Sequence, residues 1–434
     1  MKDPSYNRTW INKTVNEDEL SSYGKDHKGK LFYTMFPIQD TSYRFKVQFI
    51  ITADTHTNVD IISEYAEINR TMIITTGVEY INIPSVVVNL ETGRSYTTFF
   101  ISADQLITVV GLISEFSCNS DCESSSFIVL PLTVLDKEYS LITQPNNIQN
   151  CGIIATATNT TIVIEIDLKS KISVGNAIIQ PGQNINMVLD YLEGFNIQTH
   201  SNLTATKIYA NKPIAVISGN KYSSQKVVTK RYPYRRYHSD SVYESMIPID
   251  KWCRHFIIPP IHKASSFIIR IISRYRNTTI TIKDNSSWSI AERGDQIEIE
   301  LSPKSYYVSA SNPILLCMYA LTEGSGISMM IVPGIEHFSK EYVIAPPKDM
   351  FSTNCITIII KTSDVNGLRF VGNLLTVEST VIMARNESFT TVVKTMTGHS
   401  VYKIRHVSRT ALYGVVVYGF KYDSAYGYPA GFRF

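Results

Sequence analysis

Four short apolar runs recur along the chain, and polar stretches separate them. The runs read LITVVGLI from Leu106, PIAVISGN from Pro213, PILLCMYA from Pro313 and LYGVVVYG from Leu412. Each is too short to span a membrane, which needs about 20 apolar residues. The runs are rich in β-branched and aromatic residues, which favours buried strands over helices. We therefore predict four structurally equivalent central strands.

Other elements recur at similar places around these runs. A β-branched residue stands five positions upstream of each start, at Ile101, Ile208, Val308 and Val407. An alternating segment comes earlier, at Thr57–Ile61, Thr160–Ile164, Thr278–Ile282 and, in a weaker form, Cys355–Ile359. A glycine then precedes the next strand, at Gly77, Gly182, Gly294 and Gly398. An apolar or aromatic residue before proline ends each copy, at Leu130-Pro131, Ile247-Pro248, Val332-Pro333 and Tyr428-Pro429. The spacing, roughly 100 residues, is that of a β-sandwich and is too long for a helical repeat or a propeller blade.

The pattern predicts an all-β fold of four tandem sandwich-like repeats packed together. We divide the chain into a polar lead at 1–30 and repeats at 31–130, 131–247, 248–332 and 333–434. The linkers are short and not rich in Gly or Ser, so the repeats should pack on one another. A closed pseudo-fourfold ring or propeller-like arrangement is the alternative. An aromatic-proline pair at both ends, Phe36-Pro37 and Tyr428-Pro429, would allow the last segment to complete the first repeat.

Composition narrows the classes of partner and compartment. The net charge is +3 over 434 residues, which argues against a nucleic-acid binder. The first 30 residues are polar and carry no apolar segment typical of a secretory signal, so we expect a processed chain or part of a longer, multidomain one, and an intracellular protein is the less favoured alternative. No run is long enough for a membrane span.

Cysteines and glycosylation sequons favour an extracellular protein. We expect at least two disulfides among six candidates, Cys118, Cys122, Cys151, Cys253, Cys317 and Cys355, although a buried free thiol is an open alternative for Cys317. Eight Asn-X-Ser/Thr sequons are candidate glycosylation sites, namely Asn7, Asn12, Asn69, Asn159, Asn202, Asn277, Asn285 and Asn386.

No pattern indicates catalysis, a metal site or a cofactor. The Gly324–Gly326 triplet lacks the spacing of a nucleophile elbow. The spacing of Cys118 and Cys122 is not followed by a second pair of ligands, as a zinc site requires. Glu298 and Glu300 alternate with apolar residues and so belong to the wet face of a strand. We predict a protein that is not an enzyme.

A basic and tyrosine-rich insert, residues 221–245, makes the second repeat the longest. It contains Lys226 and Lys230 and the candidate partner-binding residues Arg231, Tyr232, Tyr234, Arg235, Arg236 and Tyr237. Arg and Tyr commonly anchor interfaces, so an acidic glycan or an extracellular protein would be a suitable partner. Two alternatives stay open: the tyrosines pack on the neighbouring repeat, or Asp240 and Glu244 neutralise the cations internally.

Three segments resemble the N-terminal domain of the IgGFc-binding protein family. They are Phe36-Pro37, the stretch from Tyr243 through Pro248 to Trp252, and the closing Val417–Phe420 with Tyr426–Pro429. The resemblance covers about residues 30 to 432. Where the family typically carries Asp-His and Trp-Gly pairs, this chain has Tyr237–Asp240 and Trp252-Cys253. The resemblance implies a secreted, non-catalytic adhesion or mucus-scaffold module, often found beside von Willebrand type D modules.

We therefore expect a secreted recognition, adhesion or matrix-scaffold module that binds an extracellular glycoprotein or protein. A carbohydrate-binding or carbohydrate-processing protein on a β scaffold is the alternative. Two facing carboxylates about 5 to 10 Å apart in a deep cleft would favour the alternative, because glycoside hydrolysis needs such a pair.

Overall fold

The chain is almost entirely β, as predicted. The computed structural model describes residues 26–37, 45–65, 68–75, 77–88, 91–115, 123–145, 148–166, 172–174, 177–180, 182–229, 232–282, 286–292, 294–322, 326–348, 351–370, 373–374, 379–397, 401–421 and 424–434. Within these ranges the helical elements are short 3₁₀ turns, η1 (Ser85–Val88), η2 (Ile249–Lys251), η3 (Ile335–His337) and η4 (Thr362–Gly367). The polar lead up to residue 25 lies outside the described residues.

We describe the strands as four units in chain order. Unit 1 has β1 (Gly29–Met35), β2 (Phe45–Ala53), β3 (Thr57–Ser63), β4 (Ile68–Ile74), β5 (Gly77–Ile83), β6 (Gly93–Ser95), β7 (Thr98–Glu115) and β8 (Ser124–Val129). Unit 2 has β9 (Asp136–Ser140), β10 (Gln149–Ala155), β11 (Thr160–Glu165), β12 (Ile172–Val174), β13 (Ala177–Ile179), β14 (Asn184–Leu189), β15 (Gly194–Thr199), β16 (Lys207–Thr229) and β17 (Tyr232–Ser245). Unit 3 has β18 (Cys253–Ile258), β19 (Ala264–Ser273), β20 (Thr278–Ile282), β21 (Ser286–Ile290), β22 (Gln296–Leu301), β23 (Tyr306–Thr322) and β24 (Ile327–Ile331). Unit 4 has β25 (Glu341–Ile344), β26 (Thr353–Lys361), β27 (Leu368–Phe370), β28 (Asn373–Leu374), β29 (Ser379–Ala384), β30 (Glu387–Met396), β31 (Tyr402–His406), β32 (Tyr413–Lys421) and β33 (Ser424–Pro429).

Each of the first three units is built around one long strand, which we call the hub strand: β7, β16 or β23. The first half of a hub strand pairs with the opening strand of its unit and, on the other side, with β3, β11 or β20. The second half pairs with β2, β10 or β19 and with the closing strand of the unit. Each unit is therefore a sandwich-like pair of sheets that share the hub strand.

The two halves of the hub strand explain the pattern in the sequence. In β23 the first half alternates between buried and partly exposed residues, whereas every residue from Ile314 to Thr322 is buried. A strand with one wet face alternates, and a strand covered on both faces is apolar throughout. The predicted apolar runs are thus the doubly covered halves of the hub strands. The polar residues between the two halves bind the neighbouring strand. Asp104, Asn211 and Ser311 each accept a hydrogen bond from one of its backbone N–H groups.

The pairing register places the apolar runs at matching positions. Their first inward residues lie opposite the last paired residues of the neighbouring strands, in the pairs Ile107 and Ala53, Ile214 and Ala155, Ile314 and Ser273, and Tyr413 and Ile360. The prediction that these runs are equivalent central strands agrees with this register. The predicted boundaries between repeats stay a prediction.

Unit 4 departs from the other units because its hub strand is broken into β31 and β32. Ile404 of β31 lies opposite Tyr342, as Ile101 lies opposite Phe32 in unit 1. The chain has three more residues between Ile404 and Tyr413 than between Ile101 and Ile107. The prediction that Val407 occupies the position of Ile101 is therefore wrong, and Val407 is 63% exposed. The break separates the sandwich into two sheets, β25-β31-β27-β28 and β29-β30-β26-β32-β33.

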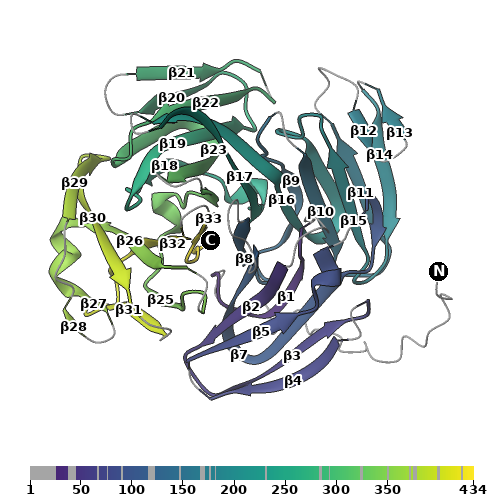
Figure 1. Cartoon of the computed structure of the whole chain (residues 1–434), viewed down its shortest axis with the longest axis horizontal. Coiled ribbons are helices and arrows are strands. Elements are labelled where there is room, and N and C mark those ends of the chain that lie inside the picture. The colour runs from purple at the N-terminus through teal and green to yellow at the C-terminus, as the bar shows by residue number, and fades with distance from the viewer. Residues whose placement is uncertain are drawn as a thin grey trace.

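The units form a closed ring around the strands that end each unit, which we call the axis strands: β8, β17, β24 and β33 (Figure 1). In space β8 lies beside β17, β17 beside β24, β24 beside β33, and β33 beside β8. At the seam between units 4 and 1, the His27 N–H donates to the Phe432 carbonyl at 2.8 Å. The backbones of Asp26 and Arg433 pair there in an isolated antiparallel β-bridge. The last segment therefore packs onto the first unit, as the ring alternative predicted.

Candidate functional site

The axis strands bring one carboxylate of unit 2 into contact with the other three units. Asp240 of β17 is fully buried. Its Oδ1 accepts a hydrogen bond from the Ser124 N–H of β8 at 2.5 Å. Its Oδ2 accepts from the Ile327 N–H at 3.2 Å and from the Ala425 N–H at 3.0 Å, at the starts of β24 and β33. One side chain thus binds the starts of three axis strands that lie far apart in the sequence.

Glu244, which follows Asp240 in β17, also accepts hydrogen bonds from backbone amides on the ring axis. Its Oε1 accepts from the Ile128 N–H of β8 at 3.1 Å and from the Ser245 N–H at 3.0 Å. The side chain is also fully buried. Asp240 and Glu244 are therefore structural acceptors on the ring axis. The hypothesis that they neutralise the cations of the insert stays a prediction, because the side chains of those cations lie outside the described residues.

Burial raises the pKa of Asp240 and of Glu244 well above the ordinary carboxyl value. Removal from water penalises the charged form, and the hydrogen bonds from backbone N–H groups offset only part of that penalty. Glu123 adds a repulsive charge near Asp240. Both carboxyls have zero exposure, so neither can reach a substrate.

The predicted insert is an extension of the hairpin formed by β16 and β17, which we call the arm: the residues beyond the Ser223–Asp240 pair, 224–239. β16 has 23 residues and β17 has 14, whereas β8, β24 and β33 have six, five and six. Backbone pairing continues from Ser223 opposite Asp240 to Thr229 opposite Tyr232. Asp240 thus fixes the arm at its base, on the ring axis.

Of the candidate partner-binding residues, Arg231 lies outside the described residues, as does Lys230. Tyr232, Tyr234, Arg235, Arg236 and Tyr237 lie in β17, and their side chains are outside the described part. The backbone places these five within residues 232–237 of the arm, beyond the pair formed by Ser223 and Asp240.

Polar side chains hold the base of the arm. The Gln144 N–H donates to Asn220 Oδ1 at 2.7 Å, and Asn220 Nδ2 donates to the Gln144 carbonyl at 2.9 Å. The Ser223 hydroxyl donates to Gln144 Oε1. All three side chains are buried. These bonds tie the base of the hairpin to unit 2.

A cysteine and a histidine meet at the seam of units 3 and 4 but do not form a nucleophile pair. Cys253 Sγ lies 3.2 Å from His337 Nε2. The same Nε2 donates to the Lys251 carbonyl at 2.7 Å, so it carries the proton and cannot take one from the thiol. Burial raises the pKa of Cys253, with a further contribution from Glu336, and burial lowers the pKa of His337 to about 4. A buried neutral thiol of this kind is unreactive.

The prediction of at least two disulfides is wrong. Cys151, Cys253, Cys317 and Cys355 are buried free thiols. They lie in four different strands, β10, β18, β23 and β26. Each packs among apolar neighbours in a hydrophobic core. Cys118 and Cys122 lie outside the described residues, which leaves room for one bridge at most.

The described sequons lie at the surface. Asn69, Asn159, Asn202, Asn277 and Asn386 are all exposed. Asn159 and Asn277 occupy matching turns with positive φ, 52° and 51°, just before β11 and β20. Asn7, Asn12 and Asn285 lie outside the described residues. Glycosylation of these asparagines stays a prediction.

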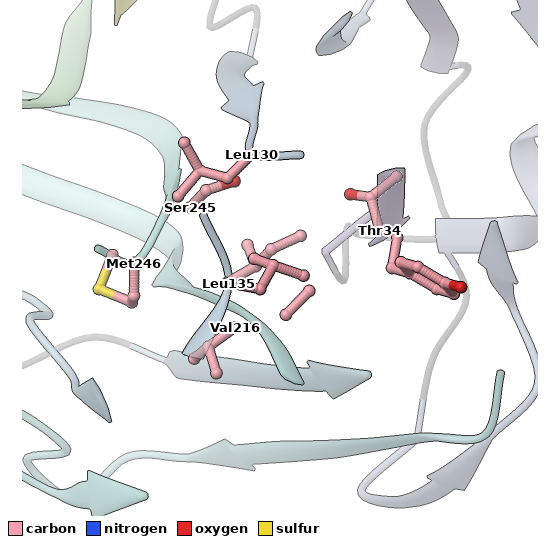
Figure 2. A pocket seen from close by; sticks show the side chains of 9 residues that line it. Thr34, Leu130, Leu135, Val216, Ser245 and Met246 are labelled. Atoms are coloured by element: carbon pink, nitrogen blue, oxygen red, sulfur yellow. The ribbon is translucent and has the colours of Figure 1, made fainter. Parts of the chain in front are cut away.

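The cavity between units 1 and 2 is too small for a ligand. Figure 2 shows it lined by Thr34, Leu130, Leu135, Val216, Ser245 and Met246. Its volume of about 10 Å³ is roughly the room of one water molecule. Among the residues that the structure describes, no cluster of His, Cys, Asp or Glu could hold a metal ion. The same residues contain no helix that is both long and apolar enough to cross a bilayer.

Two comparisons with known proteins agree with one another. A family model described as IgGFc binding protein matches residues 125–419, from the first axis strand to the second half of the last hub strand. A human protein named IgGFc-binding protein is 20% identical over an alignment of 279 residues that covers 60% of this chain. That stretch is 5% of the relative, so the chain spans about one-twentieth of the length of the protein it matches.

Proposed function

Because this chain belongs to the IgGFc-binding protein family, we propose that it is an extracellular, non-catalytic recognition module that binds a protein partner through the arm. The partner that suits the arm best is an acidic extracellular glycoprotein, such as a sulfated mucin. Immunoglobulin Fc, which the name of the human relative mentions, belongs in the same binding test.

The observation that carries this proposal is the length of the β16–β17 hairpin. The ring needs only the base of β17, because the other axis strands close their units with five or six residues. The arm adds a further stretch of paired backbone beyond what the described strands of the other units show. An extension that the fold does not require is the kind of element that recognition sites use.

The composition of the arm supports an acidic partner. Five cations and three tyrosines fall between Lys226 and Tyr237. Arginine binds carboxylate and sulfate groups through a planar fork, and tyrosine adds contact area at low conformational cost. A strand scaffold holds these residues in place before binding, which lowers the entropy that the complex must lose.

The surroundings of Asp240, Glu244 and Cys253 support structural rather than catalytic roles for these three residues. Hydrolysis of a glycoside needs two carboxyl groups that reach the substrate. Asp240 and Glu244 are buried against backbone amides, and the thiol of Cys253 faces a histidine that already carries the proton. The alternative of a carbohydrate-processing enzyme has no support from these groups.

The test compares two double variants on a surface coated with sulfated mucin. Arg235→Ala/Arg236→Ala should weaken binding at least tenfold and leave the free energy of unfolding within about 0.5 kcal/mol of the parent, as surface substitutions do. Lys137→Ala/Arg409→Ala removes two other exposed cations and is the matched control, with binding unchanged. Binding by the parent should weaken as salt rises.

Unchanged affinity of the arm variant for mucin and for Fc, with a folded protein, would exclude the arm as the recognition site. Equal losses in the arm variant and in the control would indicate non-specific charge attraction instead.

A further inference from the structure

Exposed tyrosines gather at the seam of units 1 and 2. Tyr65 follows β3 by two residues, and Tyr96 precedes β7 by two residues. β3 and β7 pair antiparallel, so the end of β3 lies beside the start of β7 and brings the two tyrosines to the same end of neighbouring strands. Their exposed fractions are 51% and 49%. Large rings that face water together form a patch of the kind that marks interaction sites, whereas single ones are common.

A third tyrosine, Tyr191 of unit 2, reaches the same seam and is half-buried. Its ring centroid lies 6.1 Å from that of Tyr33 and 6.5 Å from that of Phe100, edge to face in both cases. Tyr33 and Phe100 are buried and lie opposite each other on β1 and β7, so they hold Tyr191 in place. Burial raises the pKa of Tyr191, and the nearby charge of Glu64, the residue before Tyr65, adds to the rise. The turn after β3 and Tyr191 are therefore close neighbours.

A buried carboxylate lies beside the exposed rings. Glu193 is 5% exposed, and its Oε1 accepts hydrogen bonds from Arg94 Nη1 at 2.5 Å and from the Tyr96 hydroxyl at 3.3 Å. Its Oε2 accepts the Asp190 N–H at 2.9 Å. Arg94 Nη2 donates to the Val188 carbonyl at 2.9 Å, while the side chain of Arg94 stays 51% exposed. These bonds fix a guanidinium and a tyrosine hydroxyl at the surface.

The rings and the fixed polar groups define the chemistry of a suitable ligand. The electron-rich face of a tyrosine attracts the slightly positive C–H groups of a flat partner. A neutral hexose has such a C–H face, and the hydroxyl groups around its ring can donate to a carboxylate and accept from a guanidinium. Arg94 brings one positive charge, whereas Glu64 and Glu193 bring two negative charges, which would repel an acidic sugar. The patch therefore suits a neutral sugar.

We propose that Tyr65, Tyr96 and Tyr191 form a binding site for a neutral hexose unit of a glycan, and that Arg94 and Glu193 orient its hydroxyl groups. The site gives the carbohydrate-binding alternative a place in the fold without any catalytic role. It does not rest on the proposed function of the arm. One sugar ring offers few atoms for contact and so binds weakly, and the site would add to attachment through the arm rather than replace it.

Saturation-transfer NMR with simple sugars tests the proposal. The probes are methyl β-galactoside, methyl β-glucoside and methyl α-mannoside at millimolar concentrations, which suit a site that contacts one sugar ring. The parent should transfer saturation to at least one probe, most strongly to ring C–H protons. The signal should persist at about 0.5 M salt, because stacking does not depend on exposed charges, which salt screens.

Matched variants assign the signal to the patch. Tyr65→Ala/Tyr96→Ala should weaken binding of the sugar at least tenfold. Tyr275→Ala removes a tyrosine of similar exposure, 46%, from unit 3 and is the control, with binding unchanged. Tyr96→Phe keeps the ring and removes the hydroxyl that donates to Glu193, so it should weaken binding less than the double variant does. If the double variant fails to fold, Tyr65→Ala alone, in an exposed turn, should still weaken binding at least threefold.

Several outcomes would overturn the proposal. They are no saturation transfer to any of the three sugars, an affinity that the tyrosine variants leave intact, and equal losses in the double variant and in Tyr275→Ala. The Arg235→Ala/Arg236→Ala variant separates this site from the arm, because it should lose mucin binding and keep the hexose signal. Mucin binding that depends on the arm, in a parent that binds no hexose, would overturn this inference and leave the proposed function standing. Hexose binding without any mucin or Fc binding would do the reverse.

Discussion

Asp240 Oδ2 accepts the backbone N–H of Ala425, which lies 185 residues further along the chain. Through this bond and those from Ser124 and Ile327, one carboxyl joins units 1, 3 and 4 to unit 2. Asp240→Ala leaves three buried N–H groups without acceptors, so it should lower the free energy of unfolding by about 3 to 5 kcal/mol. Urea denaturation checks this.

The matched control for that substitution is Asp250→Asn, because Asp250 is exposed and pairs with Lys251 at the surface. Its cost should be at most about 1 kcal/mol, the usual range for an exposed pair. Equal costs at the two positions would contradict the role assigned to Asp240.

The pH dependence of stability should carry a signature of the axis. Burial raises the folded-state pKa of Glu244, so the folded protein holds the proton more tightly than the unfolded chain does. That contribution is complete below the ordinary carboxyl pKa, about 4, and is lost as the pH rises through the raised pKa. Glu244→Gln should remove this loss. The stability of the parent relative to the variant should therefore fall with rising pH, by at most about 1.4 kcal/mol per pH unit.

Asp54 provides the opposite case at the seam of units 1 and 4. Burial acts to raise its pKa, but a hydrogen bond from Lys403 and the charges of Lys28 and Arg405 hold it below the ordinary value. Its contribution is present above the ordinary carboxyl pKa and is lost as the pH falls. Asp54→Asn should thus lower stability mainly at neutral pH, so the stability of the parent relative to this variant should rise with pH. The same direction of pH dependence for Asp54→Asn and Glu244→Gln would contradict the assignment.

A close contact between Cys253 and Gly334 predicts coupled substitutions. A β-carbon on Gly334 would lie 2.4 Å from the Cys253 Cβ. In unit 1 the glycine stands on the other side of the contact. Gly29 begins the opening strand, where Cys253 stands in unit 3, and its added β-carbon would lie 2.2 Å from the Cβ of Pro131, which follows the closing strand. Gly334→Ala should cost about 1 to 3 kcal/mol through overpacking. Cys253→Gly should recover part of that loss in the double variant, which a double-mutant cycle measures. Additive costs would show that the two positions are independent.

The buried cysteines predict a labelling pattern. Cys151, Cys253, Cys317 and Cys355 should resist a thiol reagent in the native protein and react in denaturant without prior reduction. Burial raises the pKa of each of these thiols, which lowers the thiolate fraction as well as the access. Mass spectrometry of the labelled chain checks this, and a disulfide at any of the four would contradict the structure.

The sequence predicted the strands that are buried on both faces, because continuous apolar runs record that environment directly. It misplaced Val407, since a three-residue addition in unit 4 shifts the register and only the pairing of Ile404 with Tyr342 reveals it. It also equated Pro429 with Pro131. Pro131 follows β8, whereas Pro429 lies within β33 opposite Val416.

The role of Asp240 was hidden from the sequence for a different reason. A lone acidic residue beside a basic segment gives no sign of burial, and its partners belong to three other units.

The glycines of the repeat pattern mark turns, but not always the same turn. Gly77 begins β5 and Gly294 precedes β22, whereas Gly182 precedes β14, after the additional β12–β13 hairpin of unit 2. All three have positive φ, which explains why glycine occurs there.

The central claim is that the ring is a scaffold and the arm is the recognition element. Replacing residues 224–239 with Asn-Gly joins the paired residues Ser223 and Asp240 by a two-residue turn of the type that hairpins favour. The variant keeps Asp240 and the buried base of the arm. We predict an unfolding free energy within about 1 kcal/mol of the parent, as for surface changes, together with loss of binding to the sulfated-mucin surface. A folded variant that binds mucin as tightly as the parent would contradict the claim, and so would a variant that unfolds.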